Sequence, residues 1–381
     1  MAIRRDRVAL NPIQWMATDD GWLDPALSPP PRELLARVKS AGFDAVFLDV
    51  PGGWADDDYR RLLDDVGLAP APGYFSLGAS EGDEDVAALE GRAAGAALRH
   101  AAFGLTDIVV ATGMSREAPR VIHPARGYQA DPARLARIIP QIARVAEAMR
   151  AEGVRAAFHP HVGTWVETEE ETRAVLDAID SALLAFAPDT GHLAWADADV
   201  RALVAEYAAR VRVLHVKDCR LAVARRGKER DDTYRQTVRE GLWVEPGRGE
   251  LDLKAMLAPL PPDFRRLGRR RGRPTRHQRS LGEREGLRGV DANPYRLTGL
   301  KHDPVDRGSV DRPPDRAALP LLRDERVVPW FDRVPERLRR ARRIFMRPLQ
   351  PSEDAQIAVV GPVRAFDEGG ERDGCTRLNF A

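Results

Sequence analysis

The chain has 381 residues, a net charge of +1, and 43% hydrophobic and 31% charged residues, a composition typical of a globular protein with one large α/β domain or two smaller ones. A charge this close to zero gives no general attraction to nucleic acid or to acidic membranes. No apolar run reaches the roughly 18 residues of a membrane span, and the first residues lack the apolar stretch of a signal peptide. We therefore expect a cytoplasmic protein. Cys219 and Cys375 have neither disulfide-framework nor zinc-site spacing.

Short apolar runs alternate with helix-like segments from residue 6 to about residue 260. This alternation is typical of parallel strands joined by crossover helices. We predict strands at residues 7–12, 44–50, 68–76, 107–112, 154–160, 183–189 and 211–218. Seven such units predict a (β/α)8 TIM barrel of the α/β class whose eighth strand is missing or degraded, because closure with eight strands is the common solution for this repetition.

The segment 131–153 shows how the intervening helices are delimited. Asp131 is a suitable N-cap and Pro132 suits the first helical turn. Pro140 lies inside the apolar pattern, and a proline there removes a helical hydrogen bond. The sequence therefore predicts a helix that starts after Asp131 and is kinked or broken at Pro140.

After about residue 262 the sequence becomes rich in Arg, Pro and Asp and loses its periodicity. We divide the chain into a barrel domain at residues 1–262 and an irregular C-terminal tail at residues 263–381. The tail is either a disordered basic segment or the product of a shifted reading frame, since skipping one nucleotide after Phe264 allows an apolar strand that carries a glutamate. Without an eighth strand, we expect an unpaired barrel edge at the first and seventh strands.

Polar side chains follow the fifth, sixth and seventh strands, and active sites of such barrels lie at these strand ends. The two-residue period places His159 and His161 on one face of the fifth strand. Asp189 ends the sixth strand, and His215 and Lys217 share one row of the seventh. Adjacent strands thus deliver His159, Asp189 and His215 to one rim. This set predicts a site for a divalent metal (Mn, Co, Mg or Zn) with an open coordination position.

Structural alternatives exist for several of these features. The segment "DTGH", residues 189–192, also fits an Asx-turn that caps the next helix. The two histidines after the fifth strand also fit a loop in which both are hydrogen-bonded. Glu167 lies in an acidic run that either starts a helix, where the helix dipole favours negative charge, or presents an acid or base to a substrate.

Residues suited to a hydroxyl-rich ligand follow other strands. Amide and indole side chains come after the first two strands and an arginine lies in a Gly-rich turn: Asn11, Gln14, Trp15, Trp54 and Arg248. Indole faces pack on C–H surfaces and amides bond hydroxyls, so this set predicts substrate binding. The alternative for each is ordinary loop packing. The turn around Arg248 is either a plain loop or a lid whose arginine clamps an oxyanion.

The motifs "NPIQW", "FHPHVGTWVET", "DTGHLAWA", "HVKD" and "EPGRGELD" occur in this order over roughly residues 7–262. Together they resemble the sugar phosphate isomerase/epimerase family of xylose isomerase-like TIM barrels, close to its inosose dehydratase branch. The resemblance implies a divalent ion held by a Glu, an Asp, a His and a last Glu from strands five to eight. These positions fall on His159, Asp189 and His215, and the last Glu has no counterpart. His161 and His192 match positions that approach the substrate in related dehydratases.

The resemblance and the residues together predict a metal-dependent enzyme that removes a proton alpha to a carbonyl of a sugar or cyclitol. It would act as an isomerase, an epimerase or a dehydratase, with an inosose dehydratase-type lyase as the more specific alternative. His161, Glu167 and His192 are candidates for proton transfer, and Lys217 for stabilising an oxyanion. We expect a small-molecule partner, neither nucleic acid nor membrane, and allow for a homo-oligomer.

Two rival functions remain. An endonuclease-type barrel that cuts DNA at abasic sites would need several metals and further histidines after the seventh strand, and "CRLAVARRGKERDD" contains none. A non-catalytic or degenerate sugar-binding barrel would keep the pocket without turnover. The missing glutamate of the eighth strand supports this second rival.

Overall fold

The computed structural model describes residues 2–4, 8–18, 21–78, 85–261, 264, 356–360 and 377–379. All of them belong to one compact unit, Met1–Ala292 together with Leu349–Ala381. The second unit, Asn293–Pro348, lies outside the described residues, as does most of the predicted C-terminal tail. None of the described helices has the length and apolar character to cross a bilayer.

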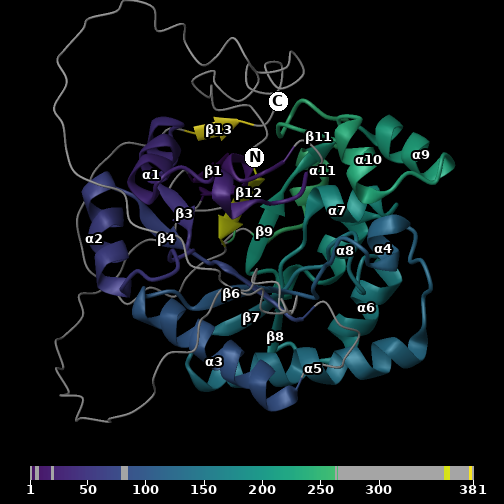
Figure 1. Cartoon of the computed structure of the whole chain (residues 1–381). Helices are drawn as coiled ribbons and strands as arrows, with labels where there is room; N and C mark the ends of the chain where they lie inside the picture. Colours follow the sequence, from purple (N-terminus) through teal and green to yellow (C-terminus); the bar gives the residue numbers. More distant parts are fainter. Residues whose placement is uncertain are drawn as a thin grey trace, which may run out of the picture. The chain divides into compact units, whose positions relative to one another are not determined.

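Parallel strands form most of the two main sheets, β4-β3-β2-β12-β9 and β5-β6-β7-β8 (Figure 1). They are β2 Val8–Asn11, β3 Ala45–Phe47, β4 Ala69–Ala71, β5 Tyr74–Ser76, β6 Asp107–Ala111, β7 Arg155–Phe158, β8 Leu184–Phe186 and β9 Val213–Val216. Parallel pairing runs from β2 through β3 to β4, and from β5 through β6 and β7 to β8. Parallel bridges, Phe186 with Val211 and Asp189 with His215, connect β8 to β9. All seven predicted strands are therefore present.

One predicted strand, residues 68–76, is divided into β4 and β5 at Pro72 and Gly73. Pro72 has no N–H for a ladder, and the N–H of Gly73 instead donates to Nε2 of His100 at 3.0 Å. A side chain at Gly73 would collide with the carbonyl oxygen of Leu48. The bend therefore depends on glycine at this position, and it lets one strand pair with β3 through its first half and β6 through its second.

The position between β9 and β2 is taken by β12, Gln356–Val360, which pairs antiparallel with both (Figure 1). Ala358 is the partner of Ala9 on one side and of His215 on the other. The expected unpaired edge is therefore wrong, because β12 pairs with the backbone of both edge strands. β12 is not the parallel eighth strand of a (β/α)8 barrel, and no parallel strand fills that position among the residues described.

Helices follow the strands along the chain, as expected for crossover connections. They are α1 Pro31–Ser40, α2 Asp56–Val66, α3 Val86–Ala102, α4 Pro119–Ile122, α5 Pro132–Ala151, α6 Glu169–Ala178, α7 Thr190–Trp195, α8 Val200–Glu206, α9 Leu221–Glu229, α10 Tyr234–Arg239 and α11 Leu253–Leu257. Short 3-10 helices span Pro12–Trp15, Pro25–Leu27 and Ala208–Arg210. Two small antiparallel pairs complete the described elements, β1 Ala2–Arg4 with β13 Arg377–Asn379 and β10 Asp218–Cys219 with β11 Trp243–Val244.

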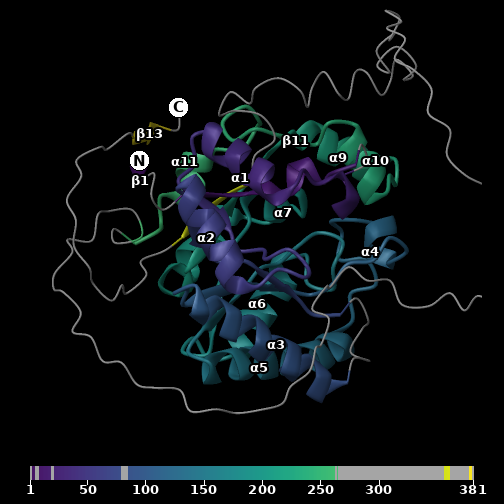
Figure 2. The same cartoon turned by 60° about the vertical axis from the view of Figure 1, so that its left-hand side comes forward.

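Helix α5 confirms its predicted start and corrects its predicted interior. The Asp131 carboxylate accepts a hydrogen bond from the N–H of Ala133, so the N-cap is present. The helix continues through Pro140, so of the two predicted alternatives, a kink or a break, the break is excluded. Its buried face, which includes Ile138 and Ile142, belongs to one hydrophobic cluster with α3. Packing along α3, visible in both views (Figure 1, Figure 2), therefore outweighs the local cost of the proline.

Alanine and valine side chains, together with Phe47, fill the space enclosed by the strands. This interior cluster consists of Ala9, Ala45, Phe47, Ala71, Val109, Ala157, Ala185, Ala187 and Val213. Because side chains alternate along a strand, the next inward position after Ala157 is His159, after Ala187 is Asp189 and after Val213 is His215. The pattern that builds the interior also brings these polar side chains to the carboxyl ends of the strands.

Candidate metal centre

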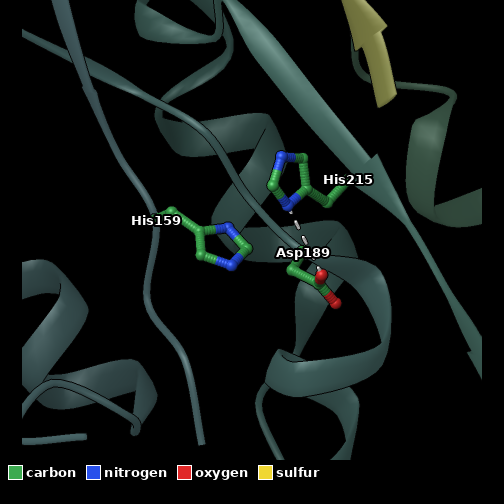
Figure 3. A group of neighbouring side chains, drawn as sticks. All are labelled: His159, Asp189 and His215. Carbon is green, nitrogen blue, oxygen red and sulfur yellow. Dashed lines mark ion pairs between the residues drawn. The ribbon is translucent and has the colours of Figure 1, made fainter. Parts of the chain in front are cut away.

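His159, Asp189 and His215 lie together at the carboxyl ends of β7, β8 and β9 (Figure 3). One ligand atom from each lies within 4.8 Å of the other two. The three residues are 2%, 0% and 3% exposed, respectively. Adjacent strands therefore place two imidazoles and a carboxylate around one point, as the sequence predicts.

The two oxygens of Asp189 have different surroundings. Oδ1 accepts hydrogen bonds from the N–H groups of Gly191 and His192, at 2.9 and 2.8 Å, and so caps α7. Oδ2 is buried and accepts no hydrogen bond, but lies 3.6 Å from Nζ of Lys217 and 3.8 Å from Nδ1 of His215. The Asx-turn predicted as an alternative is therefore present, and it leaves the second oxygen available for a cation.

His159 and His215 are both neutral, and neutral imidazole is the form that binds metal. Burial lowers the pKa of His159 to about 4, against the attraction of Asp189, and burial also lowers the pKa of His215 well below its usual value. Nδ1 of His159 lies 3.2 Å from the Ala187 carbonyl oxygen and donates to it in the tautomer whose Nε2 keeps a free lone pair. Nε2 of His215 is buried without a hydrogen-bond partner. Neutral imidazoles and an unbonded carboxylate oxygen fit a divalent cation such as Mn, Co or Zn.

A second group of polar side chains lies against the three. Nζ of Lys217 lies 2.6 Å from Nε2 of His192, and the rings of His161 and His192 have centroids 3.6 Å apart. His159 lies between His161 and His215, with centroid distances of 5.7 and 4.3 Å. His161 is half-buried and the other four are buried. The structure thus gathers four histidines and a lysine that the sequence singled out.

Aromatic side chains that the sequence analysis missed surround this group. The Trp243 ring meets His192 edge-on at 5.1 Å, and Nζ of Lys217 lies 5.0 Å from its centroid. Tyr234 stacks on His161 at 6.4 Å and contacts Trp195 at 5.0 Å. Trp195 and Trp243 sit inside or next to quoted motifs, so a signal for them existed. Tyr234 lies on α10, and nothing local in its sequence connects it to the site.

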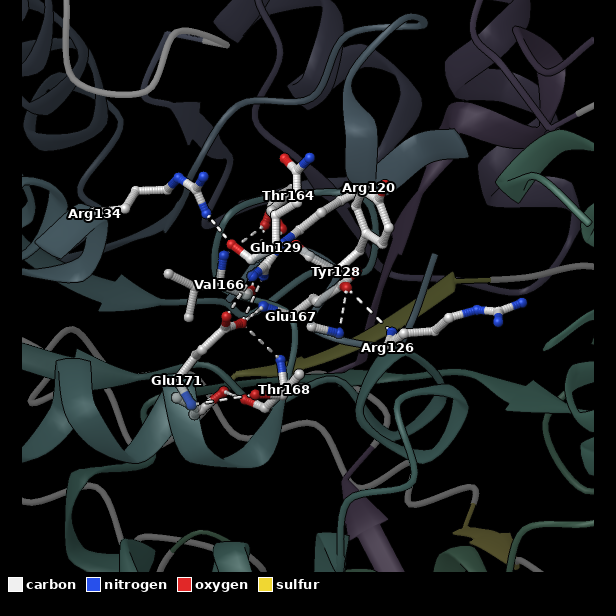
Figure 4. A network of polar contacts seen from close by, with 12 residues as sticks. Arg120, Arg126, Tyr128, Gln129, Arg134, Thr164, Val166, Glu167, Thr168 and Glu171 are labelled. Atoms are coloured by element: carbon white, nitrogen blue, oxygen red, sulfur yellow. Dashed lines mark hydrogen bonds and ion pairs between the residues drawn. The ribbon is translucent and has the colours of Figure 1, made fainter. Parts of the chain in front are cut away.

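Glu167 lies in a different environment from the one predicted for an acid or base (Figure 4). Its Oε2 accepts hydrogen bonds from the N–H groups of Ala125 and Gly163, at 3.1 and 2.9 Å. Its Oε1 accepts from Arg126 and Gly127, at 3.2 and 2.9 Å. Burial raises the pKa of this carboxyl, while the hydrogen bonds from Gly163 and Ala125 and the charge of Arg120 act in the opposite direction. The carboxylate therefore joins the loop of residues 125–127 to the loop that contains Gly163.

A buried ion pair supports the same loops (Figure 4). Arg120 donates to both oxygens of Glu171 at 2.7 and 2.5 Å, and the two residues are 1% and 5% exposed. Arg120 also donates to the carbonyl oxygens of Tyr128 and Thr164, at 3.0 and 3.3 Å. This network connects α4 and the following loop to the start of α6.

Asp218 holds the Gly-rich turn that contains Arg248. Its Oδ2 accepts from the N–H groups of Gly247 and Gly249, both at 2.9 Å. Its Oδ1 accepts from Cys219 and Leu251, at 2.9 and 3.2 Å. A Cβ at Gly249 would collide with the Asp218 carboxylate, so glycine is required there. The turn is a tethered loop in this structure.

The five predicted substrate-binding residues have different environments. Asn11 is the last residue of β2, Gln14 is 9% exposed and its Oε1 has no hydrogen-bond partner, and Trp15 packs against the core. Trp54 is 39% exposed and lines a surface cavity of about 620 Å³ beside α1 and α2, whose lining includes none of the four histidines. The Arg248 side chain is 60% exposed and lies 3.8 Å from Glu245. Their roles stay predictions.

A family model and several known proteins are similar in sequence to this chain. Residues 35–261 match the family model described as Xylose isomerase-like TIM barrel. The rhizopine catabolism protein MocC of Rhizobium meliloti is 29% identical over 265 residues, which cover 67% of this chain and 77% of MocC. The inosose dehydratase of Lactiplantibacillus plantarum is 34% identical over 102 residues, which cover 27% of this chain but only 34% of that enzyme.

Two solved structures resemble the chain at low sequence identity. L-ribulose 3-epimerase is 19% identical with a TM-score of 0.46, and covers 68% of this chain and 77% of its own. D-allulose 3-epimerase from Methylomonas sp., in complex with D-allulose, is 16% identical with a TM-score of 0.45, and covers 66% of this chain and 78% of its own.

Proposed function

The chain belongs to the xylose isomerase-like TIM barrel family, and we propose that it is a metal-dependent enzyme that isomerises, epimerises or dehydrates a sugar or cyclitol. The reaction would begin with removal of a proton alpha to a carbonyl. The observation that carries the proposal is Oδ2 of Asp189, which is buried, accepts no hydrogen bond and faces a neutral histidine. A buried carboxylate oxygen that accepts no hydrogen bond is costly. Lys217 compensates its charge only from 3.6 Å, and a metal ion bound directly to Oδ2 would compensate it fully.

His159, Asp189 and His215 would hold a divalent ion, Mn, Co, Mg or Zn. The ion would supply polarisation of the substrate's carbonyl oxygen, which acidifies the neighbouring C–H bond. Lys217 provides a second positive group beside the ligands, 3.6 Å from Asp189, and would stabilise negative charge that develops on a substrate oxygen. Burial lowers the pKa of Lys217, against the attraction of Asp189.

His161 and His192 would transfer protons. Nδ1 of His161 lies 2.7 Å from the Val162 carbonyl oxygen and donates to it, so Nε2 is free to accept a proton. His161 is half-buried, which gives it access to a substrate. Nε2 of His192 accepts from Lys217 while its Nδ1 is buried without a partner. The aromatic side chains of Trp195, Tyr234 and Trp243 would limit the access of water to this pair.

A cyclitol is the more specific substrate that we propose. Inosose dehydratase and MocC, a protein of rhizopine catabolism, are the named relatives. Gln14 supports the binding of a polyol, because its buried Oε1 lacks a donor that a substrate hydroxyl would provide. Trp54 and Arg248 are exposed and lend the proposal no support.

One observation favours a second candidate, a barrel that binds a sugar without turning it over. The fourth carboxylate implied by the family resemblance belongs on a parallel eighth strand. In the part of the chain that the structure describes, antiparallel β12 occupies this position. A site of three ligands could then bind metal and ligand but lack a second base.

Deuterium incorporation distinguishes the two candidates. The protein is incubated in D2O with a panel of 2-ketoses and cyclitol ketones, with and without Mn²⁺ or Co²⁺, and deuterium at the carbon next to the carbonyl is followed by NMR. The enzyme would incorporate deuterium only with metal. Asp189→Asn would abolish incorporation, whereas Asp252→Asn, which changes the exposed N-cap of α11, would not. Metal binding without incorporation on any ketone would support the second candidate.

A further inference from the structure

We infer that Glu167 is a positioning residue. Its carboxylate occupies a nest of backbone N–H groups and thereby holds the loop of residues 161–166, the His161 loop, beside His192. The inference rests on the proposed function, in which His161 transfers a proton. The nest consists of the consecutive N–H groups of Ala125, Arg126 and Gly127, together with that of Gly163. Consecutive N–H groups that point inward in this way form an anion-binding concavity.

The backbone of the nest adopts a conformation that needs support. Ala125, Gly127 and Gln129 have φ angles of +60°, +59° and +52°. Glycine adopts this left-handed region freely, but an alanine or a glutamine does so only against steric repulsion. The carboxylate, by accepting three N–H groups from residues 125–127, provides a compensating interaction. Without these hydrogen bonds, the strained backbone of residues 125–129 would relax to another conformation.

The same carboxylate oxygen that binds Ala125 also binds Gly163, and so transmits the position of the nest to the His161 loop. This loop is internally closed: the N–H of His161 donates to Val166 O at 3.1 Å, and Thr164 donates to His161 O through its N–H and its hydroxyl. A displacement of Gly163 therefore moves His161. The movement would change the 3.6 Å separation between the His161 and His192 rings.

Glu167 is itself fixed from the opposite side. Its N–H donates to Oε2 of Glu171 at 3.0 Å, and the N–H of Thr168 donates to the same oxygen at 3.2 Å. Arg120 holds Glu171 by two hydrogen bonds. A hydrogen-bonded network, built on the buried Arg120–Glu171 pair, therefore holds the carboxylate at the nest (Figure 4).

The hydrogen bonds also oppose a role in proton transfer. Both oxygens of Glu167 already accept two N–H groups each. A proton added to either oxygen would point at a backbone donor, which costs the protonated form a hydrogen bond. Holding the loops and exchanging protons with a substrate are therefore competing uses of this group, and the geometry favours the first.

The test compares Glu167→Gln with the matched control Glu170→Gln, which makes the same change at an exposed position of the neighbouring helical turn. Glutamine keeps the size but replaces one acceptor oxygen with an NH2 group that faces N–H donors. Amide hydrogen exchange, read by mass spectrometry in peptides spanning 123–130 and 161–166, should accelerate at least about tenfold in Glu167→Gln. Glu170→Gln should match the wild type.

Strain at Ala125 supplies a compensating variant. Ala125→Gly removes the repulsion at φ +60°, so the double variant Glu167→Gln/Ala125→Gly should exchange about fivefold more slowly in 123–130 than Glu167→Gln alone. If Glu167→Gln does not fold, Gly127→Ala disturbs the nest from its other side, because its Cβ would lie 2.9 Å from Thr168 Cγ2. This variant should accelerate the same peptides.

The pH dependence of turnover separates positioning from proton transfer. With a substrate from the deuterium assay, Glu167→Gln should lower kcat about tenfold to a hundredfold but keep both limbs of the pH profile. Loss of one limb with wild-type amide exchange would overturn the inference, and so would unchanged exchange in every nest variant. If no ketone is turned over, the proposed function fails, while the exchange measurements still decide whether the nest depends on Glu167.

Discussion

Oδ2 of Asp189 lies 3.8 Å from Nδ1 of His215, while Oδ1 of the same carboxylate caps α7 through two backbone N–H groups. The charge of Asp189 and its helix cap can therefore be separated by mutation. Asn keeps a capping oxygen but removes the charge, whereas Ala removes both.

Both Asp189→Asn and Asp189→Ala should lose Mn²⁺ affinity by more than about 100-fold, since the loss even of an outer-shell partner typically costs about 10-fold to 100-fold. In the metal-free protein both variants leave Lys217 without its counter-ion, and Asp189→Ala should lose about 1 kcal/mol more than Asp189→Asn because it also removes the helix cap. Calorimetric titration with Mn²⁺ and urea unfolding measure the two effects. Wild-type Mn²⁺ affinity in Asp189→Asn would contradict the proposed ligand set.

Lys217 should compensate the charge of Asp189 when no metal is bound, because its Nζ lies 3.6 Å from Oδ2 and both groups are buried. Lys217→Met keeps the length of the side chain but leaves a buried carboxylate without its cation, which should destabilise the metal-free protein by about 3 kcal/mol. Thermal unfolding should then show a larger rise of Tm on addition of Mn²⁺ than in the wild type. Lys254→Met, at an exposed position of α11, serves as the control, and equal rises in all three proteins would refute the expectation.

His100 should make stability depend on pH between about 4 and 6.5. Burial lowers the pKa of His100 from 6.5 to about 4, against its hydrogen bond with Ala96. Its neutral ring donates to Ala96 O and accepts from Gly73 N. In this window the unfolded chain binds a proton that the folded protein does not, so stability falls as the pH falls. The contribution across the whole window is about 3 kcal/mol.

Urea unfolding at pH 7, 6, 5 and 4 tests this expectation by comparing the wild type with His100→Gln. The variant should lose less stability on acidification, because glutamine at position 100 has no ring to protonate. A His100→Gln profile parallel to that of the wild type would show that His100 is not the source.

Gly249→Ala should disrupt the turn that Asp218 holds. The added Cβ would collide with the Asp218 carboxylate, and the four hydrogen bonds from the turn and from Cys219 could not all persist. Amide exchange in residues 247–251 should accelerate, with a loss of about 1 to 3 kcal/mol in stability. Gly95→Ala is the matched control: no heavy atom lies within 4 Å of its Cβ in α3, so it should stabilise the protein by up to about 1 kcal/mol.

Local patterns were sufficient for the barrel strands and for the convergence of His159, Asp189 and His215. Along β7 and β9, every second side chain points into the space enclosed by the strands. Following this two-residue period from Ala157 and Val213 leads to His159 and His215. Asp131 caps its helix as the sequence predicts. These features depend on residues within a few positions of one another, and strand or helix periodicity encodes such spacing directly.

The sequence by itself determined the seven parallel strands and the convergence of His159, Asp189 and His215, because the periodicity of each strand selects the side chains at its end. Only the tertiary structure decided that β12 pairs with β2 and β9, that Tyr234 stacks on His161, and that Glu167 binds the N–H groups of residues 125–127. Those contacts join residues about 40 to 350 positions apart in the chain. They depend on how whole helices, strands and loops pack against one another, and the spacing of residues within one segment does not encode that packing.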